Sequence, residues 1–383
     1  MRSDNTASVY KHDSHDSHDS SVTQNVFTDE RHVNIQEDWE ALAREYAPEF
    51  HFYETEEYLP SSVEWFLARA ELQYSENPKG GYGVFETVVP NGKIDSQNLA
   101  NIVIRHTDHN KLQVFEGIDP MENDIATGVP FDHYATFSNN SFQLKLVDKK
   151  DYKGNLESAR CYAHTHYLEG THQIEISYSL FFPYNGPLPA SKLFNWFSSL
   201  TNVGTHEGDW EHITIRLKND SHVEKNPMHR IEGVFLSAHS DNEGEWYTVD
   251  KIRPQAHANR NEKNTLFLKG EQIVAWVAKS THGIYNRDGE IQRRTSEAGG
   301  IGNEILPYEL TSETANIKKL NCAANLEYVT EQLEHSQPPH RHWMFFNGRW
   351  GANPGGLLTS GNGPTGPMFK SYWKKEPKKF IEK

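Results

Sequence analysis

The residues best suited to chemistry lie in one short segment, 204–217, which reads GTHEGDWEHITIRL. Alternation along a β-strand places Asp209 and Glu211 on one face with the apolar residues that follow them. That face is expected to be buried, and a buried carboxylate needs a partner because an isolated charge is expensive to desolvate. Since His206 precedes the pair by one short turn, the three residues predict a divalent-cation site. Oxygen ligation favours Mg²⁺ or Ca²⁺ there, and Mn²⁺ or Zn²⁺ would also be compatible.

Two other predicted strands end in matching polar groups. His239 follows one strand, and Ser280, His282 and Tyr285 follow another. If these ends meet at one rim of the fold, His239, Ser280 and Tyr285 would bind the ligand beside the cation. In an enzyme, Glu211 or His282 would instead act as general base on a metal-bound water. The competing interpretation is that each histidine is a separate, hydrogen-bonded structural residue.

Two further histidine pairs have spacing compatible with metal binding. His164 and His166 share one face of a predicted strand, and so do His340 and His342. A two-histidine metal site is one interpretation of each pair, and an exposed strand face is the favoured one. The sequence contains no nucleophile elbow, Walker A loop or HExxH motif. It therefore lacks these local signatures of hydrolases, nucleotide-binding enzymes and zinc proteases.

Short alternating segments separated by polar loops must position these residues. No helical segment of the βαβ type lies between them, so a parallel α/β sheet is not expected. The predicted fold class is mainly β, an antiparallel β-sandwich with long loops. Two short N-terminal helices are expected over 38–46 and 61–72, the second capped by Ser61 or Ser62. The predicted strands are 160–168, 173–182 (ended by Pro183), 209–217, 233–238, 273–278 and 340–346.

Composition narrows the classes of protein that the chain can belong to. Its 383 residues include 53 Asp and Glu against 38 Lys and Arg, a formal charge of −15. An acidic chain is a poor nucleic-acid binder because phosphate binding needs a basic surface. No apolar run is long enough for a transmembrane helix. The predicted organisation is a disordered polar tail over 1–35, a single β-sandwich domain over 36–375 and a basic tail over 376–383.

Cys161 and Cys322 are the only cysteines in the chain. A single disulfide between them is one alternative, and two free thiols in a reducing compartment are the simpler expectation. The N-terminal sequence lacks the apolar stretch of a standard signal peptide. We therefore expect a cytoplasmic protein, or one released by a route that does not use a standard signal peptide. Peripheral association with a membrane is compatible with both.

Several motifs together resemble the vacuolar protein sorting-associated protein 62 family. Residues 57–66 (EYLPSSVEWF), the GTHEGDWEH segment and the ending RWG…GPTGP follow that family's order. The resemblance covers roughly residues 40–375. Because the family is named after a trafficking phenotype, the resemblance implies a role at membranes.

The chain is also more distantly similar to necrosis- and ethylene-inducing-like proteins. Their Tyr-x-x-Phe-Pro strand end and Gly-His-Arg-His-Asp-Trp-Glu heptad look similar to residues 178–183 and 206–211. The resemblance implies an actinoporin-like β-sandwich and a cation that helps a cytolytic protein to recognise sphingolipid head groups. Gly208 departs from the heptad, which has a histidine at that position. By position, the implied cation ligands are His206, Asp209, Glu211 and the uncharged Asn185.

Two functions from different classes follow from these observations. The leading hypothesis is divalent-cation-dependent recognition of a membrane lipid or glycan head group, in a toxin-like or membrane-trafficking protein. The alternative is a metal-dependent hydrolase of ester, phosphoester or glycosidic bonds that uses the same residues. The expected partner is a lipid or glycan head group, with no nucleic acid and no transmembrane segment.

Overall fold

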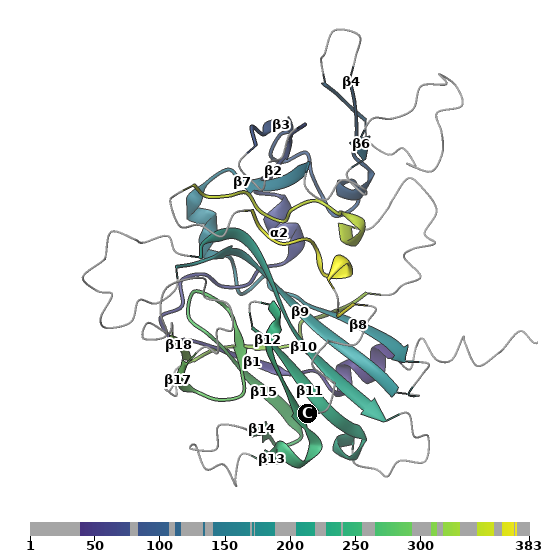
Figure 1. Cartoon of the computed structure of the whole chain (residues 1–383), viewed down its shortest axis with the longest axis vertical. Coiled ribbons are helices and arrows are strands. Elements are labelled where there is room, and N and C mark those ends of the chain that lie inside the picture. Colours follow the sequence, from purple (N-terminus) through teal and green to yellow (C-terminus); the bar gives the residue numbers. More distant parts are fainter. Residues whose placement is uncertain are drawn as a thin grey trace, which may run out of the picture. The chain divides into compact units, whose positions relative to one another are not determined.

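Two six-stranded β-sheets carry the fold (Figure 1). The structure is a computed structural model, and residues Trp39–Lys383 form one compact unit. Within the described residues, no helix is long and apolar enough to cross a membrane. The described residues are 39–76, 83–106, 112–115, 133–134, 141–168, 171, 173–187, 204–218, 227–238, 240–254, 265–292, 308–311, 317–329, 343–355, 362–370 and 372–373.

The first sheet has the strand order β12-β11-β10-β9-β8-β20. Neighbouring strands of this sheet pair antiparallel, except that β20 pairs parallel with β8. The two central strands are long, and nearly every residue of both is buried because each face of this part of the sheet packs against a core. The strands are β8 (Cys161–Leu168), β9 (Gln173–Asn185), β10 (His206–Lys218), β11 (Ile231–Ala238), β12 (Ser240–Thr248) and β20 (Leu326–Tyr328).

The second sheet has the order β13-β14-β15-β1-β19, and β16 pairs with β15. One apolar cluster joins the two sheets, and it includes Phe52 of the second sheet and Phe182 of the first, whose rings meet edge to face. The sheets therefore share a core, as the layers of a sandwich do. The strands are β1 (Glu49–Phe52), β13 (Ile252–Pro254), β14 (Leu266–Lys269), β15 (Gln272–Val277), β16 (Ile284–Tyr285) and β19 (Lys318–Asn321).

A second core covers the other face of β8, β9 and β10. Tyr162, Phe181 and Trp210 point into it and meet Trp343 and Trp350 from the C-terminal part of the chain. The short helix α2 (Val63–Leu67) and the sheet β3-β2-β7 complete this core, with β2 at Ala70–Tyr74, β3 at Glu86–Val89 and β7 at Phe142–Leu146.

The remaining elements are short. Residues 39–45 are helical. The others are β4 (Val103–His106), β5 (Leu112–Phe115), β6 (His133–Tyr134), β17 (Gly289–Gln292), β18 (Tyr308–Thr311), and the 3₁₀ turns η1 (Leu99–Asn101), η2 (Lys149–Lys153), η4 (Pro227–Arg230), η5 (Val249–Lys251), η8 (Trp343–Phe345) and η9 (Pro367–Phe369).

The mainly β, largely antiparallel fold class is confirmed, but three element predictions were wrong. The predicted helix over 61–72 ends at Leu67, because Ala70–Tyr74 pairs with β7 and β3 instead. The hydroxyl of Ser62 caps it as predicted, accepting from the Trp65 N–H. Pro183 does not end β9, because the pairing of β9 with β8 stops at Ser179 and an unpaired edge tolerates a residue without an N–H. The segment predicted as a strand over 340–346 contains the 3₁₀ turn η8 instead.

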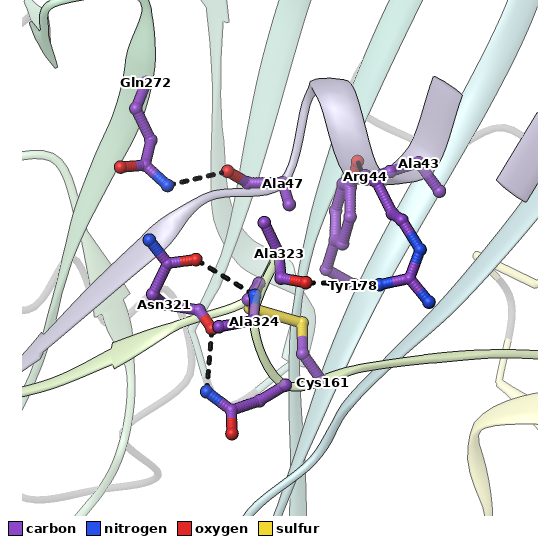
Figure 2. Close-up of a disulfide and its surroundings, with 11 residues drawn as sticks. Ala43, Arg44, Ala47, Cys161, Tyr178, Gln272, Asn321, Ala323 and Ala324 are labelled. Atoms are coloured by element: carbon purple, nitrogen blue, oxygen red, sulfur yellow. Dashed lines mark hydrogen bonds between the residues drawn. A yellow bond between two sulfur atoms is a disulfide. The ribbon is translucent and has the colours of Figure 1, made fainter. Parts of the chain in front are cut away.

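The expectation of two free thiols was also wrong. Cys161, the first residue of β8, forms a disulfide with Cys322, directly after β19, with the two Cα atoms 5.3 Å apart. Figure 2 shows the helical residue Arg44 above this bond, where its guanidinium donates to the Ala323 carbonyl at 3.2 Å. Because β8 and β19 lie in different sheets, the disulfide links the two layers covalently.

Candidate functional site

The carboxylate of Asp209 and the imidazole of His282 meet inside the protein. Asp209 lies near the start of β10, and His282 lies in the loop between β15 and β16. Asp209 Oδ2 is 3.2 Å from His282 Nδ1, and the His282 side chain is fully buried. The imidazole also stacks on Phe182, with the ring centroids 3.8 Å apart and the planes 7° from parallel. The structure therefore brings Asp209 and His282 together.

Both ring nitrogens of His282 face oxygen acceptors. Nε2 lies 3.0 Å from the backbone carbonyl of Tyr58, and Nδ1 faces the Asp209 carboxylate. A carbonyl and a carboxylate only accept hydrogen bonds, so both oxygens are placed to accept from this ring. Burial acts to raise the pKa of Asp209, but the hydrogen bond from His282, together with the neighbouring basic side chains including Lys370, outweighs it and holds this pKa below its usual value. Asp209 is thus kept ionised.

A tight loop places His282 beside Asp209. Ser280 and His282 both have positive φ angles, 68° and 61°, which few residues other than glycine adopt. The buried carboxylate of Glu56 holds the loop by accepting from the backbone N–H of Ser280 at 2.6 Å and of Tyr58 at 2.8 Å. Gly186, after β9, donates its N–H to the Ser280 carbonyl at 2.7 Å. Sequence reasoning missed Glu56, because its partner lies 224 residues away.

His206 begins β10 directly opposite Asn185, the last residue of β9. Its Nδ1 lies 2.7 Å from the Gly208 carbonyl, which fixes the proton on Nδ1 and leaves Nε2 as the acceptor nitrogen. Asn185 donates from its amide nitrogen to the Gly204 carbonyl at 2.9 Å, which leaves its side-chain oxygen as an acceptor. Burial lowers the pKa of His206, although the nearby Asp209 charge acts to raise it, so the imidazole is neutral at pH 7.

Glu211 has a different partner from Asp209. The hydroxyl of Ser237 on β11 donates to its Oε2, and the same hydroxyl accepts the backbone N–H of His212 at 2.8 Å. Among the described residues, no group of three or more His, Cys, Asp or Glu side chains is arranged to hold a metal ion. His239 lies outside the described residues. Tyr285, on β16, pairs with Trp276 of β15.

The backbone of the GTHEGDWEH segment is fixed by the C-terminal motif. Gly208 has φ +63°, and a Cβ there would lie 2.0 Å from the carbonyl oxygen of Trp350. A Cβ on Gly351 would lie 1.9 Å from the carbonyl oxygen of Glu207. Glycine at both positions thus lets the RWG segment lie directly against the start of β10. Two motifs about 140 residues apart in the sequence are thus in direct contact in the fold.

Glu207 is a second buried carboxylate that sequence reasoning missed. Its Oε1 accepts from the Tyr152 hydroxyl at 2.8 Å, and its Oε2 accepts from the backbone N–H groups of Leu146 at 3.0 Å and Ala352 at 3.4 Å. Burial raises the pKa of Glu207 to about 7, although these hydrogen bonds act to lower it. Strict alternation places Glu207 on the same strand face as Asp209, two residues later, so the sequence pattern did not indicate its contacts with Tyr152, Leu146 and Ala352.

The strand face that carries His164 and His166 is buried, which corrects the expectation of an exposed face. His164 stacks on Trp373 with ring centroids 3.9 Å apart. His166 lies 3.4 Å from the carboxylate of Glu175, which also pairs with Arg216 at 2.5 Å. The second pair, His340 and His342, lies outside the described residues.

The family model described as vacuolar protein sorting-associated protein 62 matches residues 6–111 and 141–355. A search of curated proteins gives no match.

Several solved structures are distantly similar to the chain. One described as a toxin fold for microbial attack and plant defense is 14% identical, with a TM-score of 0.33, over 90% of this chain and 91% of that one. NLPPya in complex with mannosamine is 13% identical, with a TM-score of 0.28, over 78% and 80%. Necrosis and Ethylene inducing Protein 2, from the causal agent of cocoa's Witches Broom disease, is 12% identical, with a TM-score of 0.23, over 61% and 73%. TM-scores this low indicate a distant likeness.

Proposed function

The chain belongs to the vacuolar protein sorting-associated protein 62 family, and from that premise we propose that it recognises the polar head group of a membrane lipid or glycan through a divalent cation held at the start of β10. The observation that carries the proposal is the fixed tautomer of His206. Histidines that bind metals usually donate their other ring N–H to a carbonyl or carboxylate, and His206 Nδ1 faces the Gly208 carbonyl in that way.

Three side chains around this point fit a cation. His206 offers Nε2, Asn185 lies opposite it in the strand pair and offers its side-chain oxygen, and Asp209 supplies a negative charge close enough to affect His206. One nitrogen and two oxygens suit Ca²⁺, Mg²⁺ or Mn²⁺, and Zn²⁺ less well. The cation would supply coordination positions for the hydroxyl or phosphate oxygens of a head group. Glu211, bonded to Ser237, would support the strand next to these ligands.

The hydrolase alternative stays a prediction. It gave Glu211 or His282 the role of general base, and a general base needs a lone pair that can reach the substrate proton. His282 is fully buried with both ring nitrogens facing acceptors, so its geometry favours support of Asp209. Ser280 and Tyr285 stay candidate ligand-binding residues beside it. Turnover of an ester, phosphoester and glycoside panel would test the alternative.

We also propose that the protein works in an oxidising compartment, where it acts as a toxin-like or membrane-trafficking protein. The buried disulfide between Cys161 and Cys322 supports this location, because disulfides persist in oxidising compartments and are rare in the cytosol.

Sedimentation with vesicles tests the cation-dependent function. The vesicles would contain phosphatidylcholine with or without a glycosylated sphingolipid, in Ca²⁺ or in EDTA. We expect the full chain to bind the glycosylated vesicles in Ca²⁺ alone, His206→Ala to lose binding, and the exposed-histidine control His229→Ala to retain it. Because burial lowers the pKa of His206, binding should persist below the ordinary histidine pKa of 6.5 and fail at still lower pH. Equal binding in Ca²⁺ and EDTA would overturn the proposal.

A further inference from the structure

A surface cavity of about 580 Å³ opens where helix α2 turns into strand β2, and Figure 1 labels these two elements. Ala68 and Arg69 form that turn, and Val147 and the start of η2 form the opposite side. The Val147 N–H donates to the Arg69 carbonyl at 3.2 Å, so the backbone of the two sides is joined at the base. The volume is within the range of about 300–1,000 Å³ that small ligands occupy.

Arg69 is held in a fixed orientation in this cavity. Its guanidinium lies over the Trp65 ring, 4.1 Å from the centroid, and donates from Nη1 to the Trp65 carbonyl at 2.9 Å. Its Nε lies 3.5 Å from the carboxylate of Asp151. A guanidinium has five N–H donors in one plane, so within the described contacts three of them remain for a ligand. Because the group is already ordered, binding costs little further side-chain entropy.

The other polar groups of the cavity are balanced in charge. Asp148 and Asp151 supply acceptor oxygens, while Lys150 and Asn91 supply donors beside Arg69. Lys150 pairs with Asp148 at 2.9 Å, as Arg69 does with Asp151, so the lining has two positive and two negative charges. An anion would meet two carboxylates, and a cation would meet two basic groups. A neutral ligand rich in hydroxyl groups suits this lining, because each hydroxyl both donates and accepts.

The cavity also has an apolar part. Val147 is 58% exposed, although its neighbours in β7 are mostly buried, and it lies with Ala68 among the polar groups. Sugars present both hydroxyl groups and flat C–H surfaces, so they match a lining of planar polar groups beside aliphatic side chains. We propose that this cavity is a second binding site, for a neutral sugar, and that it works without a cation.

This sugar site shares no residue with the proposed cation site on His206, Asp209 and Asn185. Binding to it can therefore be measured while the cation site is disabled. Saturation-transfer NMR on the full chain in EDTA would use methyl glycosides of glucose, galactose, mannose and N-acetylglucosamine as probes. Glucose 6-phosphate would serve as the charged probe. His206→Ala in the same buffer should bind the neutral glycosides as the unmodified chain does.

Two substitutions test the lining. Arg69→Lys keeps the charge and removes the planar set of donors, and Asn91→Ala removes one exposed amide. Each should raise the Kd for the bound glycoside by roughly five- to tenfold, the effect of losing one or two hydrogen bonds. Lys149→Ala, an exposed neighbour of Lys150 outside the cavity, should leave the Kd unchanged. Circular dichroism and melting curves would establish that each variant is folded.

Three outcomes would overturn the proposal. They are the absence of saturation transfer to any neutral glycoside, an unchanged Kd in both Arg69→Lys and Asn91→Ala, and binding of glucose 6-phosphate without any neutral glycoside. Loss of vesicle binding in His206→Ala with retained glycoside binding would support both sites independently.

Discussion

Asp209 stays ionised inside the protein because His282, 73 residues later in the chain, donates to it. Removing one partner of a buried pair leaves the other charge without compensation. Asp209 is therefore expected to contribute to the stability of the fold as well as to ligand binding. The two contributions must be measured separately.

We predict that Asp209→Ala lowers the free energy of unfolding by about 3–5 kcal/mol, because the buried His282 ring loses the carboxylate that accepts from its Nδ1. Urea denaturation of Asp209→Ala, His282→Ala and the double variant would check this. The double variant should cost less than the sum of the single ones, since the pair acts as a unit. Additive costs would show that the two side chains do not interact.

The raised pKa of Glu207 predicts that the stability of the fold depends on pH. Its folded pKa of about 7 lies above the ordinary 4.5, so the folded state binds this proton more tightly than the unfolded state does. The contribution to stability is therefore fully present below pH 4.5 and is lost as the pH rises through 7. We compare the free energy of unfolding of Glu207→Gln with that of the unmodified chain. Between pH 5 and pH 8.5 this difference should shift in favour of the variant by up to roughly 3 kcal/mol. Urea denaturation at both pH values would measure it, and an equal difference at both would contradict it.

At the scale of elements, the start of β10 depends on its contact with the RWG segment. Gly208 and Gly270 offer a matched comparison, because their φ angles are +63° and +65° but only Gly208 has close neighbours. Gly270→Ala should cost about 1–2 kcal/mol for the backbone conformation alone. Gly208→Ala should cost at least about 2 kcal/mol more, because its Cβ would clash with the Trp350 carbonyl. Thermal or urea denaturation would compare the two, and equal costs would show that the RWG segment does not constrain β10.

The difference between local features and strand pairing explains which element predictions succeeded. The alternation along β10 and the Ser62 cap are local features, and both are visible in the sequence. The end of α2 and the passage of β9 through Pro183 depend on which strands pair, and strand pairing joins residues that are distant in the chain. Local propensity was overridden there by tertiary contacts.

At the scale of the whole molecule, the disulfide joins two sheets across a sequence separation of 161 residues. Closing so long a loop restricts the unfolded chain, so we predict that reduction lowers the free energy of unfolding by roughly 2–5 kcal/mol. Denaturation with and without a thiol reductant would measure the effect. The Cys161→Ala/Cys322→Ala variant should be equally destabilised and insensitive to the reductant. A reductant effect that persists in this variant would have another cause.

The sequence by itself determined the family, the mainly β fold class and the strand that carries Asp209 and Glu211. These follow from local alternation and from short motifs, which need no knowledge of distant contacts. Tertiary structure alone decided that Asp209 pairs with His282 whereas Glu211 bonds to Ser237, that Cys161 meets Cys322, and that Glu56 and Glu207 are buried. The physical reason is that a buried polar group must find a partner, and the fold supplies that partner from a remote part of the chain.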